Sequence, residues 1–105
     1  MEKYDAQIYI QKEKVSFTAH MDRITFFTYI GGINRYMLLD RMRSDCTYWL
    51  GNGNRHNPHL WAGNPVDQIQ YMKWLWESFP SAGKPEWLTM EQIDALDEHM
   101  NGWKT

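Results

Sequence analysis

The sequence predicts an α+β domain in which an N-terminal β-hairpin precedes three or four packed helices. Residues 6–19 alternate between apolar and polar side chains, as strands with one buried face do. Residues 34–79 instead place apolar side chains at helical spacing. Because 105 residues with 43% hydrophobic side chains suffice for one core, we expect a single domain over residues 1–105.

The first elements are the hairpin over residues 6–19, with the polar turn Gln11–Glu13 in its middle, and a short segment at Ile24–Ile30. That segment has the β-branched and aromatic side chains of a strand, but Asp22 is placed to cap a helix. We expect a helix there, since a pair of glycines follows it and a further helix begins directly afterwards.

Two longer helices are predicted next from their apolar stripes and end signals. The first begins at the capping residue Asn34 and runs to Leu50, where Gly51 suits the left-handed residue that ends a helix. The second begins at Asn64-Pro65, a capping residue followed by the proline that the first helical position tolerates, and Pro80 ends it.

The last helix has the clearest start, because Thr89 and Gln92 match a capping box, and Gly102 marks its end. Its outer face is predicted to be acidic, with Glu91, Asp94, Asp97 and Glu98. The apolar stripes predict a common core that includes Trp49, Ile69, Met72, Trp76, Leu88, Ile93 and Leu96.

Charge is divided unevenly along the chain, whose net charge is −2. Residues 1–63 have eight Lys/Arg and six Asp/Glu, a net of +2, whereas residues 64–105 have three and seven, a net of −4. This balance excludes a strongly basic nucleic-acid binder. Cys46 is the only cysteine, so no internal disulfide forms. Without a membrane-spanning run or a signal-peptide core, we expect a cytoplasmic protein with no membrane contact.

The connection over residues 51–63 has more binding groups than a turn requires. Its glycines and asparagines are ordinary turn formers. In or beside it lie five side chains suited to binding: Trp49, Arg55, His56, His59 and Trp61. Cationic groups next to aromatic rings contact phosphates and stack on bases in single-strand binders. The alternative is a structural loop whose amides satisfy its own backbone, and the sequence leaves both open.

Neither a catalytic site nor a metal site is predicted. Cys46, His56 and His59 lack the two close ligand pairs that structural zinc sites show. A nucleophilic site built on Cys46 has no local signature, and adjacent Asp45 points about 100° away on a helix. We therefore expect a non-enzymatic protein with no cofactor and no metal.

Four short elements carry a family resemblance: DC at 45–46, LGNGNR at 50–55, LWAG at 60–63 and KPEWLT at 84–89. With them, residues 33–100 resemble large polyvalent protein-associated domain 11. Such domains occur in proteins of phages and conjugative elements, either free-standing or within long multidomain proteins. The resemblance therefore implies a mobile-element protein in a setting rich in inhibitors of host defence, and it implies no catalytic residues.

The preferred hypothesis is a small anti-CRISPR or anti-restriction inhibitor that binds a host defence protein, such as a CRISPR effector nuclease. Asp94, Asp97 and Glu98 would engage a basic nucleic-acid channel by complementary charge. Surplus Trp and Tyr would supply interface anchors. One alternative is a nucleic-acid-binding accessory module that uses the 51–63 connection, and another is a structural domain whose excess aromatics form a homodimer surface.

Overall fold

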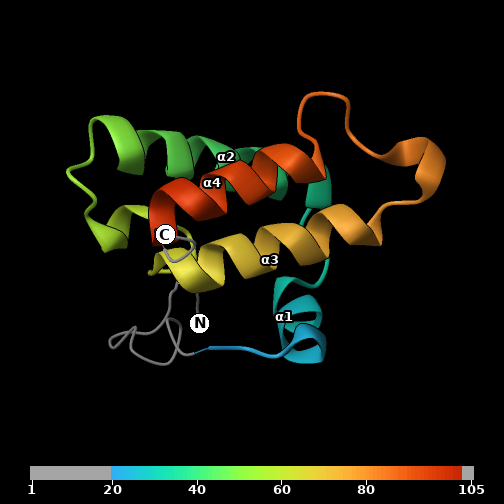
Figure 1. Cartoon of the computed structure of the whole chain (residues 1–105). Coiled ribbons are helices and arrows are strands. Elements are labelled where there is room, and N and C mark those ends of the chain that lie inside the picture. Colours follow the sequence, from blue (N-terminus) through green and yellow to red (C-terminus); the bar gives the residue numbers. More distant parts are fainter. Residues whose placement is uncertain (1–19, 103–105) are drawn as a thin grey trace.

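The computed structural model describes residues 20–102, and this part of the chain is all-helical (Figure 1). Within it lie four α-helices, α1 at Arg23–Ile30, α2 at Arg35–Gly51, α3 at Pro65–Ser78 and α4 at Met90–Asn101, and two single 3-10 turns at Asn57–His59 and Ser81–Gly83. Residues 20–102 contain no strand, so the predicted α+β class is wrong. The four helices close a core by themselves, without a sheet. The hairpin expected over 6–19 lies outside the described residues.

Side-chain caps explain where α1 and α2 begin. The Asp22 carboxylate accepts a hydrogen bond from the Thr25 backbone N–H at 2.7 Å, so the ambiguous segment after it is a helix. Asn34 Oδ1 accepts from the Met37 backbone N–H at 3.0 Å and starts α2 as predicted.

The end of α2 differs from the prediction. Gly51 is its last helical residue, and the cap after it, Asn52, has right-handed backbone angles. The left-handed residues come later, at Asn54 and Arg55, with φ angles of 53° and 55°. The helix continues through Gly51 because the chain turns back only at Gly53, whose backbone N–H donates to the Tyr48 carbonyl at 2.7 Å.

The predicted start signals of α3 and α4 are confirmed. Asn64 caps α3 and Pro65 occupies its first turn. At α4 the capping box is complete: the Thr89 backbone N–H donates to Gln92 Oε1 at 2.9 Å, and the Gln92 backbone N–H donates to Thr89 Oγ1 at 3.1 Å. Gly102 ends α4 with a φ of 59°, in the left-handed region.

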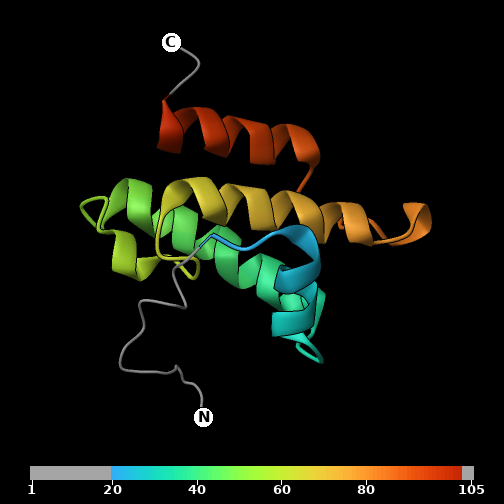
Figure 2. The same cartoon turned by 90° about the horizontal axis from the view of Figure 1, so that it is seen from below.

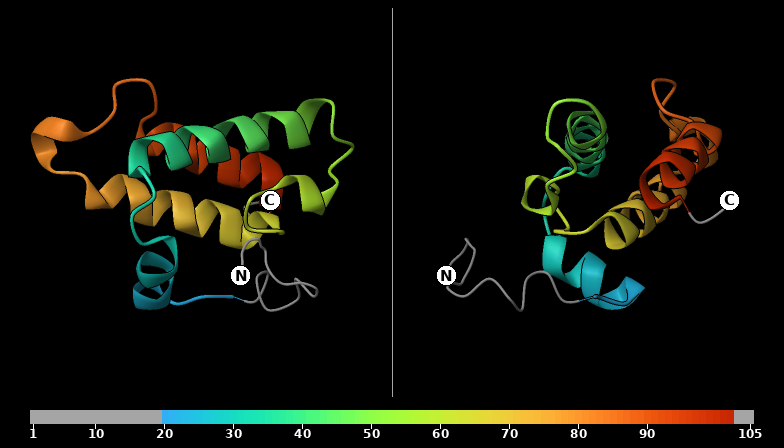
Figure 3. Two further views of the ribbon diagram at one scale, coloured as in Figure 1. Left: turned by 180° about the vertical axis from the view of Figure 1, so that it is seen from behind. Right: turned by 60° about the vertical axis from the view of Figure 1, so that its left-hand side comes forward.

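Helix α3 is central in the described fold. It contacts α1, α2 and α4, and Figure 2 shows it between α4 on one side and α1 and α2 on the other. Helices α2 and α4 run in the same direction, and α3 runs opposite to both (Figure 1). The connection over residues 79–89, between α3 and α4, extends past the helix ends (Figure 3). None of the helices between residues 20 and 102 has the length and apolar character of a bilayer span.

The core largely follows the predicted stripes. Trp49, Ile69, Met72, Leu88 and Ile93 are buried as expected, whereas Trp76 and Leu96 are only partly buried and pack against the edge of the core. On α3, Val66 is 63% exposed although it is aliphatic, whereas Tyr71 is buried. The Tyr71 hydroxyl oxygen accepts a hydrogen bond from the Met21 backbone N–H at 3.0 Å. Contact with α1 therefore shifts the buried face of α3 away from Val66.

Candidate interaction surfaces

Trp49, predicted as an interaction residue, lies in the core. Its side chain comes from α2 and is only 5% exposed. The indole Nε1 donates a hydrogen bond to Asn57 Oδ1 at 3.1 Å, and this bond connects α2 to the 3-10 turn. A ring in this position packs the loop onto the helix and has no face available to a base.

Trp61 is held in a cluster of aromatic rings from α1 and α3. Its ring meets those of Phe26, Tyr29 and Tyr71 edge-on, at centroid distances of 6.1, 6.1 and 6.2 Å. Edge-to-face contacts of this kind stabilise a packed cluster. Of the two tryptophans that a single-strand binder would use for stacking, Trp49 is therefore buried, and Trp61 is partly buried and packed against the core.

Arg55, His56 and His59 are exposed at the same end of the molecule. The Arg55 guanidinium lies over the Trp49 ring, 5.0 Å from its centroid. The His56 and His59 rings are 5.1 Å apart, and His59 also meets the Tyr48 ring edge-on at 5.1 Å. Among residues 20–102, no three His, Cys, Asp or Glu side chains gather closely enough to hold a metal ion.

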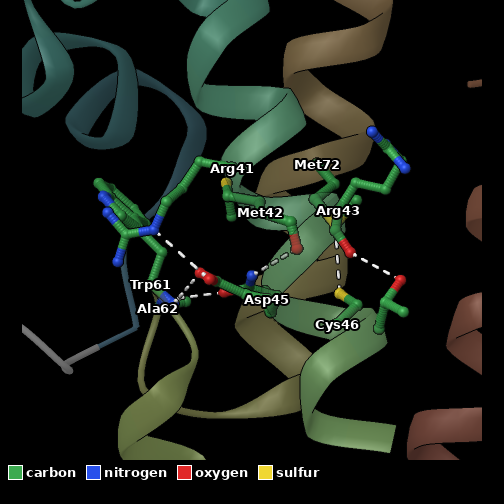
Figure 4. A network of polar contacts seen from close by, with 10 residues as sticks. Arg41, Met42, Arg43, Asp45, Cys46, Trp61, Ala62 and Met72 are labelled. Carbon is green, nitrogen blue, oxygen red and sulfur yellow. Dashed lines mark hydrogen bonds and ion pairs between the residues drawn. The ribbon is translucent and has the colours of Figure 1, made fainter. Parts of the chain in front are cut away.

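A partly buried polar network attaches the end of the 51–63 connection to α2 (Figure 4). Asp45 accepts a hydrogen bond from the Trp61 backbone N–H at 3.1 Å and lies 3.4 Å from Arg41 Nε. Gln68, fully buried on α3, accepts from the Ala62 backbone N–H at 2.9 Å and donates to the Met42 carbonyl at 3.2 Å. Burial raises the pKa of the Asp45 carboxyl, and Arg41 opposes that rise.

The short elements behind the family resemblance have structural positions in this fold. The DC element supplies Asp45, and LWAG supplies both backbone N–H groups that the network binds. In KPEWLT, the Leu88 carbonyl accepts from Trp76 Nε1 at 2.9 Å, and the following threonine caps α4. These elements fix the connections between helices. Sequence reasoning missed Gln68, and its only signal was a polar residue between the apolar positions of α3.

The acidic face of α4 is smaller than predicted. Glu91, Asp94 and Glu98 are exposed, but Asp97 is only 8% exposed and lies against α3. Its carboxylate accepts a hydrogen bond from Asn101 Nδ2 at 2.7 Å and is 3.5 Å from Lys73 Nζ. Asp97 therefore belongs to the α3–α4 contact, because Lys73 and Asn101 compensate its burial.

A pocket of about 510 Å³ opens beside this contact, between α3 and α4. Its lining residues are His20, Val66, Ile69, Gln70, Lys73, Asp97 and Asn101. His20 is fixed at the rim, with Nδ1 2.6 Å from the buried Asp67 carboxylate. The sequence could not reveal this pocket, since its walls depend on how two helices distant in sequence pack together.

Comparison with known proteins adds one finding. The family model described as Large polyvalent protein-associated domain 11 matches residues 33–100. No curated protein and no solved structure shows a significant match to the chain. The matched range contains α2, α3 and all of α4 except its last residue. It therefore includes the network, the acidic face and five of the seven residues that line the pocket.

Proposed function

Because the chain belongs to the family of large polyvalent protein-associated domain 11, which accompanies large polyvalent proteins of mobile elements, we propose that it is a non-enzymatic inhibitor of a host defence protein. The proposed target is a nuclease with a basic channel for nucleic acid, such as a CRISPR effector or a restriction enzyme. Inhibition would come from binding alone, in the cytoplasm of the bacterial host.

The observation that carries this proposal is the row of outward carboxylates on α4. Glu91, Asp94 and Glu98 follow one another at spacings of three and four residues, so they share one side of the helix. Helix α4 is the outermost helix in Figure 2, with α3 and α2 on its inner side. Carboxylates in such a row attract a basic surface and speed its association.

The nucleic-acid alternative receives less support from the geometry. Stacking on bases needs accessible rings, but Trp49 is buried and Trp61 is packed against α1 and α3. The loop still exposes Arg55, His56 and His59. These are few groups for binding phosphates in a chain whose net charge is −2. A protein partner therefore fits the charge and burial better.

The test is a charge reversal on α4 with a matched control. Glu91→Lys with Glu98→Lys reverses two of the three charges in the acidic row, whereas Glu77→Lys with Glu86→Lys changes the net charge equally at exposed sites outside α4. Each variant is expressed in cells with an active CRISPR or restriction system, and transformation by a targeted plasmid is measured. We expect the wild type and the control to restore transformation and the α4 variant to lose this effect.

Circular dichroism confirms that each variant is folded. If the wild type restores transformation against none of the CRISPR or restriction systems tested, the inhibitor proposal is refuted. If both double variants lose the effect on transformation equally, the proposed role of α4 is refuted. Loss confined to Arg55→Ala with His56→Ala would favour the nucleic-acid alternative.

A further inference from the structure

Two arginine side chains converge on one aromatic ring where α1 meets the start of α2. The guanidinium carbon of Arg35 lies over the Phe27 ring, 4.5 Å from its centroid, and that of Arg23 lies 5.9 Å from the same centroid. Arg23 and Phe27 are one turn apart on α1, and Arg35 is the first residue of α2. We call Arg23, Phe27 and Arg35 the arginine corner.

The Phe27 ring is a fixed support for the two cations. It is partly buried and packs against the core, and it meets the ring of the fully buried Phe26 edge-on, with 5.1 Å between the centroids. The attraction between a cation and the face of an aromatic ring holds each guanidinium beside Phe27. The N–H donors are therefore positioned before any ligand binds, which lowers the ordering cost of binding.

Neither guanidinium has a carboxylate partner in the part of the chain that the structure describes. The ion pairs of residues 20–102 all involve other cationic side chains. Asp22, next to Arg23 in the sequence, instead accepts a hydrogen bond from the Thr25 backbone N–H at 2.7 Å and caps α1. Two positive charges thus share one ring without a counter-ion from residues 20–102, and a bound anion would relieve their repulsion.

The chemistry of the corner suits phosphate groups of a nucleic-acid strand. Each guanidinium can bind two phosphate oxygens at once, with parallel and charge-assisted hydrogen bonds. A strand presents phosphates at a regular repeat, so two neighbouring arginines can each contact one. Guanidinium planes also stack on unpaired bases. Arg35, held over Phe27 and still partly exposed, is placed for that contact.

We propose that the arginine corner binds the phosphates of a single-stranded nucleic acid. This inference goes beyond the proposed function and does not depend on it. Helices α1 and α4 lie on opposite sides of α3 (Figure 2), so the corner and the acidic row of α4 do not compete for one partner surface. A nuclease channel holds nucleic acid, and the inhibitor would then contact the strand as well as the protein. With two cations, the contact adds to affinity without dominating it, in keeping with the net charge of −2.

The experiment is an NMR titration of the ¹⁵N-labelled full chain with a short oligo-deoxythymidylate at a series of salt concentrations. We expect backbone amide shifts at residues 23–27 and 34–36. Counterion release from two phosphates predicts that log Kd rises with log salt concentration with a slope of about 1.4. Shifts confined to other parts of the protein, or a Kd independent of salt, would overturn the proposal.

Single substitutions separate the corner from general charge. Arg23→Gln and Arg35→Gln should each lower the salt slope by about 0.7 and weaken binding about three- to ten-fold. Arg43→Gln is the matched control, because Arg43 also lies over a ring, that of Trp87, but is already paired with Asp40. It should leave the slope unchanged. Glutamine has nearly the helix propensity of arginine, and circular dichroism checks that each variant is folded. Equal effects of all three substitutions would mean that only net charge matters.

A poly-glutamate peptide, used as a competitor, distinguishes phosphates from the carboxylates of an acidic protein segment. Poly-glutamate should displace the oligonucleotide only weakly. If it binds the corner as tightly as the oligonucleotide does, the corner is a site for acidic protein segments and the nucleic-acid proposal is wrong.

These measurements need no defence protein, so their failure is distinguishable from failure of the proposed function. If the oligonucleotide does not bind while Glu91→Lys with Glu98→Lys still abolishes the effect on transformation, the corner proposal is wrong and the inhibitor proposal stands. If the oligonucleotide binds at the corner but the wild type restores transformation against no system, the corner proposal stands without the inhibitor proposal.

Discussion

Cys46 lies fully buried on α2, with its Sγ 3.7 Å from Met72 Sδ of α3. Removal from water raises the pKa of this thiol from 9.0 to about 12, and the negative charge of Asp45 adds to the rise. In the unfolded chain the same thiol would ionise near its ordinary value. Between these two pH values the unfolded state therefore binds fewer protons than the folded state.

This difference predicts a loss of stability in alkali. The contribution of the Cys46 thiol to the free energy of unfolding is complete below about pH 9 and is lost as pH rises towards about 12. Between pH 8 and pH 10.5 the free energy of unfolding should fall by on the order of 1–2 kcal/mol from this group. Denaturant unfolding at the two pH values measures the fall. Burial also raises the pKa of Tyr71, which adds a loss in the same direction at higher pH.

Cys46→Ala is the control for this prediction, because it retains every other titrating group. Its unfolding free energy should fall less between the same two pH values than that of the wild type. An identical fall in both proteins would mean that the thiol is not the cause.

At single positions the sequence was a better guide to helices than to connections. Helical spacing along α2 accounts for the buried face that Leu39, Met42 and Cys46 share. The same spacing cannot place Trp61, whose neighbours Phe26 and Tyr71 come from other helices. The 51–63 connection was therefore interpreted from residue types alone, although its tryptophan, Trp61, is partly buried and packs against the core.

Helix ends were predicted well where the signal is local. The caps at Asn34, Asn64 and Thr89 each depend on a hydrogen bond that spans three residues. Gly51 was wrongly predicted as the left-handed end of α2, because a glycine fits a helix end only if the chain turns there. Here the turn is determined by Gly53 and its contact with Tyr48.

The two glycines should therefore respond oppositely to alanine. Gly51 is helical and a methyl group there meets nothing within 4 Å, so Gly51→Ala should stabilise the protein by roughly 0.5–1 kcal/mol. At Gly53 the methyl would lie 3.0 Å from the Tyr48 ring and 3.1 Å from its carbonyl oxygen. The ring can move into solvent but the carbonyl cannot, so Gly53→Ala should cost about 1–3 kcal/mol.

Thermal or denaturant unfolding of the two single variants measures both effects. Because the substitution is the same and the sites are two residues apart, each variant is the control for the other. Destabilisation by Gly51→Ala, or no effect of Gly53→Ala, would contradict the turn described here.

For the whole molecule, the sequence anticipated the three long helices and their stripes, and the family match over 33–100 confirmed the resemblance. The fold class was wrong because it rested on the expected hairpin over 6–19, and the helices of residues 20–102 form a core without any sheet. The pocket could not be predicted, since Lys73 and Asp97 meet only through the packing of α3 on α4.

A metal-independent fold is the prediction at this scale. The core of the described residues consists of packed apolar side chains from all four helices, so folding should need no ion. After treatment with EDTA, the full chain should keep its helical circular dichroism and its unfolding midpoint, and elemental analysis should find no stoichiometric zinc. Zinc at one per chain, with loss of helix on chelation, would contradict this prediction and direct attention to His56 and His59.

The parallel directions of α2 and α4 have a consequence for long multidomain proteins that contain this domain. The matched region begins just before α2 and ends in the last turn of α4, so a chain passing through it enters at one end of the bundle and leaves at the other (Figure 1). With 17 residues in α2, these points are about 25 Å apart along the helices. Flanking domains would then lie one after another along a line, and the helices between them would act as a rigid spacer.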